Sequence, residues 1–203
     1  MEFLLIASAH FLALLSPGPD FFLLIQAALR LPLRYGFAIS GGIATANGLY
    51  LLFAVTGIEV IKEFGLLMAF LRYAGAAYLV FIGIILLRAP KQSLENITGN
   101  NHLRTHHMGR QFMLGFGSAI LNPKNAIFYL SLFTVMVAET TGFLTRCFYA
   151  LWMVSIVFFW DCGVVLFIGR PAIRARLGGA IFYIEKLSGC VLACFGLILP
   201  FTS

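Results

Sequence analysis

The chain has 203 residues, of which 61% are hydrophobic and only 11% are charged, and its mean hydropathy is +0.94. A soluble domain of this size cannot bury so much apolar surface, so the composition indicates a protein that lies in a lipid bilayer. The net charge of +6 does not indicate nucleic-acid binding, because the basic residues fall in the connections between apolar segments.

Six apolar segments are each long enough to cross a bilayer as an α-helix. The rest of the chain is too short for a second domain, so the sequence predicts one all-α integral membrane domain over residues 1–203. The predicted spans are residues 3–29, 36–57, 65–87, 112–136, 146–168 and 182–201.

The first span is interrupted near its middle by Ser16-Pro17-Gly18-Pro19-Asp20. Serine is a favoured helix N-cap, and proline is favoured at the first helical position. We therefore predict a second half-helix that begins at Ser16 and Pro17, with its free backbone N–H groups at the bilayer midplane. Asp20 falls in the first turn, where the positive end of the helix favours an anion. His10, in the same span, is either a proton relay or a packed side chain.

Polar side chains also lie near the middle of the second span. Asn47 and Thr45 can hydrogen-bond either a polar ligand or a neighbouring helix. After the third span comes a polar linker, residues 91–109, which contains His102 and His106. Two histidines four residues apart can bind a metal on a helix, but no carboxylate or cysteine accompanies them, and we predict no metal site.

The fourth span is interrupted in the same way by Asn122-Pro123-Lys124-Asn125. Here the positive end of the new half-helix opposes the charge of Lys124, so this lysine needs an anion nearby. That anion can be a substrate carboxylate, or Asp20 in a permanent ion pair that only clamps two helices together. In the fifth span, Asp161 either faces a polar site or reaches the cytoplasmic interface by snorkelling.

A shift of 106 residues places Pro17 on Pro123 and Gly83 on Gly189, and aligns both helix breaks. The chain is therefore predicted to be two repeats, residues 1–90 and 110–203, joined by the linker 91–109. Each repeat has three spans, an odd number, so the second repeat is inverted relative to the first. Broken spans with ionisable residues at matching places in two repeats are typical of a transporter's substrate site.

The basic residues predict the orientation. Ten of the 14 Lys and Arg residues lie in the three connections that share one side of a six-span protein. By the positive-inside rule that side is cytoplasmic, and both termini lie outside. The ten residues are Arg30, Arg34, Arg88, Lys91, Arg104, Arg110, Arg170, Arg174, Arg176 and Lys186.

The sequence contains none of the motifs G-x-x-x-x-G-K-[ST], G-x-S-x-G and H-E-x-x-H. We therefore predict that the chain is not an enzyme, that it does not use ATP and that it has no cofactor. An integral-membrane enzyme acting on lipid remains an alternative, but it would need ionisable groups clustered at one interface. A passive pore or scaffold is a third option. The two helix breaks, each with a charged residue, argue against it.

Three motifs resemble those of one family. Leu15-Ser16-Pro17-Gly18-Pro19-Asp20-Phe21-Phe22, Tyr73-Ala74-Gly75-Ala76-Ala77-Tyr78-Leu79 and Leu121-Asn122-Pro123-Lys124 are similar to the signatures of the LysE/RhtB superfamily of bacterial amino-acid exporters. The end of the first motif resembles the threonine-exporter branch most. The resemblance implies a protein of the cytoplasmic (inner) membrane that expels an amino acid, by proton antiport.

The prediction is therefore a secondary exporter of a small amino acid such as threonine or homoserine. A basic amino acid, or another small zwitterion or cation, is the alternative substrate. The partners of the exporter would be the amino acid, protons and membrane lipid, and a homo-oligomer is compatible with the sequence. The predicted proton-coupling residues are Asp20 and Asp161. The predicted substrate-binding residues are Ser16, Pro17, Gly18, Pro19, Asp20, Asn47, Asn122, Pro123, Lys124 and Asn125.

Overall fold

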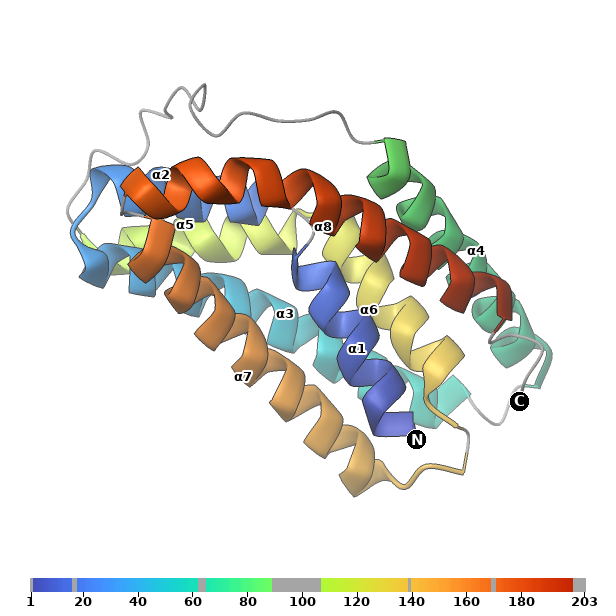
Figure 1. Cartoon of the computed structure of the whole chain (residues 1–203). Coiled ribbons are helices and arrows are strands. Elements are labelled where there is room, and N and C mark those ends of the chain that lie inside the picture. The colour runs from blue at the N-terminus through green and yellow to red at the C-terminus, as the bar shows by residue number, and fades with distance from the viewer. Residues whose placement is uncertain are drawn as a thin grey trace.

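The computed structural model describes residues 2–15, 18–61, 65–88, 107–138, 140–168 and 171–198. Within these ranges all regular structure is α-helical (Figure 1). The helices are α1 Glu2–Leu15, α2 Pro19–Arg30, α3 Leu33–Ile61, α4 Gly65–Arg88, α5 Met108–Ile120, α6 Pro123–Met136, α7 Phe143–Ile168 and α8 Pro171–Ile198.

The first predicted span is broken, but the second half-helix begins later than predicted. The axes of α1 and α2 differ by 56°. The N-cap of α2 is Gly18, with extended backbone and no side-chain cap, and Pro19 occupies the first helical position. The predicted start at Ser16 and Pro17 is therefore wrong, and these two residues lie outside the described ranges. The reason is local: a residue that precedes proline is disfavoured in the α conformation, and Gly18 has an extended backbone before Pro19.

The fourth predicted span breaks where the sequence places the break. Helix α5 ends at Ile120, and α6 begins at Pro123 with Asn122 as its N-cap. The Asn122 side chain accepts a hydrogen bond from the backbone N–H of Lys124, at 3.1 Å. This bond satisfies one of the free donors at the start of α6.

Helix α8 begins well before the predicted sixth span. It starts at Pro171 rather than residue 182, since proline suits the first helical position and the following segment is rich in helix-forming residues. Arg174 and Arg176, predicted to lie in a connection, are therefore within α8. Lys186, counted with them as a connection residue although the predicted span of residues 182–201 includes it, is also within α8. Its Nζ donates to the backbone carbonyl of Leu87, at 2.7 Å, near the end of α4.

Two of the described helices are long and apolar enough to cross a membrane. They are α3 over Leu33–Gly57, with a mean hydropathy of 1.5, and α7 over Phe143–Phe167, with 2.1. The bent pair α1 and α2 makes a third if it is counted as one span. The protein is thus an α-helical membrane protein, while the full count of six spans stays a prediction.

The helices pack around two groups of buried apolar side chains. Helix α3 makes its most extensive contact with α5, and α4 makes its most extensive contact with α8. One buried group joins α1, α6 and the C-terminal half of α3, and the other joins α2, α5 and the N-terminal half of α3; α7 contributes to both. Large apolar side chains such as Leu66, Phe53 and Leu151 are exposed on the outside, as lipid contact requires.

The contact between α3 and α5 depends on glycine. A methyl group at Gly115 would lie 2.1 Å from the carbonyl oxygen of Ile39, whereas Gly117 in the same helix has open space around it. We expect Gly115→Ala to destabilise the protein by about 1–3 kcal/mol, because the two backbones must separate. Gly117→Ala should stabilise it, because alanine favours the helix by up to about 1 kcal/mol. Thermal unfolding of the detergent-solubilised variants tests this, and equal midpoints would contradict it.

Candidate functional site

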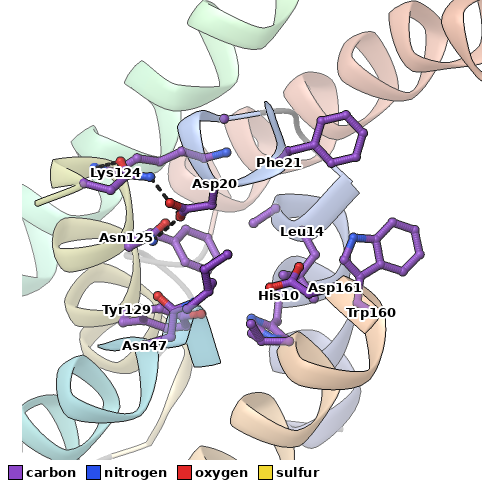
Figure 2. Close-up of a pocket in the computed structure, with 16 residues that line it drawn as sticks. His10, Leu14, Asp20, Phe21, Asn47, Lys124, Asn125, Tyr129, Trp160 and Asp161 are labelled. Atoms are coloured by element: carbon purple, nitrogen blue, oxygen red, sulfur yellow. Dashed lines mark hydrogen bonds between the residues drawn. The ribbon is translucent and has the colours of Figure 1, made fainter. Parts of the chain in front are cut away.

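A small cavity lies where the two helix breaks meet (Figure 2). Its volume is about 60 Å³, which is room for a few water molecules. It lies between the two apolar groups, since Tyr129 belongs to one and Val157 to the other. The lining residues are His10, Ala13, Leu14, Gly18, Asp20, Phe21, Ile43, Asn47, Asn122, Lys124, Asn125, Phe128, Tyr129, Val157, Trp160 and Asp161.

Asp20 is held by three polar side chains from the second half of the chain. Ser118 Oγ donates to its Oδ1 at 2.5 Å. The side-chain Nδ2 atoms of Asn122 and Asn125 donate to its Oδ2, at 3.2 and 2.9 Å. Both carboxylate oxygens are therefore hydrogen-bonded, and the first turn of α2 is tied to α5 and α6. Hydrogen bonds to a carboxylate are stronger than those between neutral groups.

Asn122 therefore has two functions. Its Oδ1 caps α6 through the backbone N–H of Lys124, while its Nδ2 donates to Asp20. Because a side-chain amide has one acceptor end and one donor end, these two contacts fix its orientation. The break in the fourth span and the charge in the first are thus joined through one residue.

Two tyrosines satisfy backbone carbonyls at the second break. Tyr50 Oη donates to the carbonyl of Ile120, the last residue of α5, at 2.5 Å. Tyr78 Oη donates to the carbonyl of Lys124 in the first turn of α6, at 3.4 Å. A broken helix in a membrane needs such partners, because lipid offers no hydrogen bonds to free carbonyls.

Lys124 extends from α6 towards the start of α2. A methyl group at Gly18 would lie 3.9 Å from Lys124 Nζ, so the lysine ammonium is close to the N-cap of α2. In Figure 2 Lys124, Asp20 and Asn125 are drawn together on the side of the cavity formed by α2 and α6. A positive side chain and two positive helix ends therefore meet there.

Three buried polar side chains line the rest of the cavity, and each has an atom without a hydrogen-bond partner. They are His10, Asn47 and Asp161, with 1%, 4% and 6% of their surface exposed. Within the part of the chain that the structure describes, no hydrogen-bond partner is present for His10 Nδ1, Asn47 Oδ1 and Asp161 Oδ2. Leaving buried polar atoms unpaired is costly, so such atoms in one cavity indicate a site for a polar ligand.

His10 has a defined tautomer. Its Nε2 lies 3.3 Å from the carbonyl oxygen of Met153 on α7, and a carbonyl can only accept, so Nε2 carries the proton. In the neutral ring Nδ1 is then an acceptor. The ring also packs against Tyr129 and Trp152, with centroid distances of 5.9 and 6.1 Å. His10 is thus both packed and part of the cavity lining.

Most of the predicted site residues that the structure describes come together here. Gly18, Asp20, Asn47, Asn122, Lys124, Asn125 and Asp161 all line the cavity. Pro19 is exposed and lines a separate groove between α2 and α5 instead, and Pro123 begins α6. The alternative that Asp161 snorkels to the interface is wrong, because its side chain is buried. Thr45 lies on the exposed side of α3 and bonds the carbonyl of Gly41.

Sequence reasoning missed Ser118 and the aromatic lining. Ser118 lies in the small-residue run Gly115–Ala119, which predicts close packing; its position, one turn before Asn122, was the available signal. Tyr129 and Trp160 line the cavity, but in an aromatic-rich apolar chain nothing local distinguishes them from residues that face lipid.

Comparison with known proteins gives matches over nearly the whole chain. The model of a family described as LysE type translocator matches residues 11–202. A threonine efflux protein of Escherichia coli (strain K12) is 27% identical over 199 residues, covering 97% of this chain and 96% of that protein. One of Salmonella typhi is 26% identical over 198 residues, with the same coverage. A leucine efflux protein of Klebsiella pneumoniae is 25% identical over 133 residues, 64% and 61% of the two chains. No solved structure matches.

Proposed function

The chain belongs to the LysE type translocator family, and from this premise we propose that it exports a small amino acid in exchange for protons. The membrane would be the bacterial cytoplasmic membrane. Family and relatives indicate a transporter rather than an enzyme, so the lipid-modifying enzyme is not retained as an alternative.

One observation carries the proposal: the cavity at the helix breaks is lined by charged side chains of both signs. Asp20 and Asp161 are acidic and Lys124 is basic. A zwitterionic amino acid needs an anionic partner for its ammonium group and a cationic one for its carboxylate. The N-terminal ends of α2 and α6 also favour a carboxylate. The relatives named threonine efflux proteins favour a substrate with a short side chain, such as threonine or homoserine.

The coupling proton would bind Asp20 or Asp161, the two acidic residues of the cavity. Protonation of the group that holds the substrate ammonium would release the amino acid. Inward movement of one proton down the membrane potential contributes about 2.3 kcal/mol per 100 mV, which can drive export against a gradient.

Two inverted repeats around this cavity would provide alternating access. The order of the elements supports them, because each half has a broken pair of helices followed by two long helices. Gly83 and Gly189, which the 106-residue shift pairs, lie against each other: a methyl group at Gly83 would be 2.7 Å from the carbonyl oxygen of Gly189. Two equivalent residues in contact are expected on a twofold axis.

The proposed orientation has both termini outside. Arg30, Arg34 and Arg110 are exposed where α2 ends and α3 and α5 begin, at one end of the molecule (Figure 1). The start of α1 and the end of α8 lie towards the opposite end (Figure 1). The positive-inside rule assigns the first end to the cytoplasm.

Counterflow in proteoliposomes tests the function. Purified protein is reconstituted in vesicles loaded with one of the twenty amino acids, and uptake of the same labelled amino acid is followed. We expect counterflow for threonine and small neutral relatives, and accumulation driven by an imposed pH gradient. Counterflow of lysine or arginine alone would support the basic-substrate alternative, and none with any amino acid would overturn the proposal.

A further inference from the structure

Two acidic residues line the cavity, but their surroundings differ. Both carboxylate oxygens of Asp20 accept hydrogen bonds, from Ser118, Asn122 and Asn125. Asp161 is buried, and its Oδ2 has no partner among the described residues. A ligand that bound Asp20 would displace existing hydrogen bonds to its carboxylate. A ligand that bound Asp161 would instead supply a hydrogen bond to Oδ2, which has none within the described residues.

The unpartnered atoms of residues that line the cavity are all hydrogen-bond acceptors. Asp161 Oδ2 and Asn47 Oδ1 are oxygens, and His10 Nδ1 is an acceptor because Nε2 donates to the Met153 carbonyl. They come from three helices, α7, α3 and α1, that line one small cavity. A group that satisfies three acceptors must carry several N–H donors and, beside a carboxylate, a positive charge. An ammonium group has three such donors.

Aromatic rings also favour a cation at this end of the cavity. Tyr129 packs against His10 at a centroid distance of 5.9 Å, and Trp160 directly precedes Asp161 in α7. Both rings line the cavity, and the face of an aromatic ring attracts a cation. Lys124 lies on the other side, drawn with Asp20 and Asn125 in Figure 2.

We infer that Asp161, Asn47 and His10 form the subsite for the ammonium group of the substrate, while Asp20 positions α2 against α5 and α6. The inference rests on the proposed function and assigns the two ends of the amino acid within that site. The carboxylate of the substrate then points to Lys124 and the starts of α2 and α6. Asn47 and His10 contribute to specificity, because a substrate with a neutral nitrogen offers these acceptors fewer N–H donors and binds more weakly.

The assignment also makes the substrate and a proton compete for the same atom. Asp161 Oδ2 can be satisfied by an N–H of the substrate or by a proton, but not by both. The ionisable groups around Asp161 are His10 from α1, Asp20 from α2, and Lys124 and Tyr129 from α6; α3 contributes the neutral Asn47. Of these, Asp20 is hydrogen-bonded through both oxygens, so the proton that competes with the substrate binds Asp161.

The test compares two ligands that differ only at the nitrogen. Binding of L-threonine and of N-acetyl-L-threonine, which lacks the ammonium group, is measured on the purified full-length protein in detergent. The panel includes the wild type, Asp161→Asn, Asn47→Leu and, as the control from the other end of the cavity, Asp20→Asn. Size-exclusion chromatography and thermal unfolding verify that each variant is folded.

We expect Asp161→Asn to weaken threonine binding by roughly 10- to 100-fold, the loss typical of a hydrogen bond to a charged group. It should leave binding of N-acetyl-threonine unchanged. In the wild type we expect threonine to bind more weakly at low pH, because a proton competes for Asp161, and this pH dependence should be lost in Asp161→Asn. Asn47→Leu, on a different helix, should act in the same direction by roughly tenfold. Asp20→Asn should change the affinities for both ligands by the same factor.

Two other outcomes separate the inference from the function on which it rests. If the wild type binds threonine, and Asp161→Asn and Asn47→Leu weaken both ligands equally or neither, the inference is overturned and the proposed function stands. If the wild type binds none of the twenty amino acids, the proposed function fails and the subsite fails with it.

Discussion

Asp20→Ala is expected to destabilise the protein and abolish transport. The substitution removes the acceptor of three donors, those of Ser118, Asn122 and Asn125. The three bonds are partly buried, and a fully buried donor left unpaired costs about 1–3 kcal/mol, so the free energy of unfolding should fall by about 2–3 kcal/mol. The link from α2 to α5 and α6 would be lost, and with it the shape of the cavity.

Asp20→Asn is the matched control for this prediction. The amide oxygen of the new asparagine can accept from Asn122 and Asn125, and its NH₂ group can donate to Ser118, whose hydroxyl also accepts. We therefore expect Asp20→Asn to retain most of the stability and to keep counterflow within about tenfold of wild type. Unfolding in SDS and counterflow in proteoliposomes measure both variants. If Asp20→Ala is as stable as wild type, Asp20 does not position α2.

The second large effect is expected for Lys124→Met. Methionine preserves the length and apolar volume of the side chain but removes the charge near the N-cap of α2. If Lys124 binds the substrate carboxylate, threonine binding should weaken by about 10- to 100-fold. Binding of threoninol, the amino alcohol that lacks the carboxylate, should remain unchanged. Equal losses for both ligands would contradict a role in carboxylate binding.

The double variant Asp20→Asn, Lys124→Met distinguishes substrate binding from a permanent ion pair. If the two residues only clamp two helices, removing both charges together should restore an active protein, since a pair can be replaced where a single charge cannot. If Lys124 meets the substrate, the double variant should fold and still fail to transport. We expect the second result, measured as uptake into inverted vesicles at matched expression. Recovery of wild-type uptake would leave Lys124 as a clamp.

Local sequence rules predicted the helix breaks well but not completely. The Asn122 cap and the start of α6 at Pro123 are confirmed, because capping depends on residues within one turn. At the first break the choice between Pro17 and Pro19 was decided by the restriction that Pro19 places on Gly18. That restriction is also local, so the sequence contained the answer. The early start of α8 at Pro171 follows from propensity that a hydropathy pattern does not register.

The sequence by itself determined the class of the protein, its family and the identity of most polar residues at the cavity. Composition alone requires lipid as the solvent, and the family that the three motifs predict is confirmed by the match over residues 11–202. A proline with a cap and a charge in a membrane span marks a site whatever surrounds it, because such groups are unfavourable in lipid unless partnered.

Only the tertiary structure decided which partner each polar group has. In the sequence, Asp20 and Asp161 are both acidic residues within apolar segments. In the structure, both carboxylate oxygens of Asp20 are hydrogen-bonded, whereas Asp161 Oδ2 has no partner within the described residues. Ser118 reaches Asp20 across 98 positions of the chain, and His10 reaches Met153 across 143. Such contacts depend on the rotation and tilt of each helix against its neighbours, and the helical period fixes the faces of one helix without saying what each face meets.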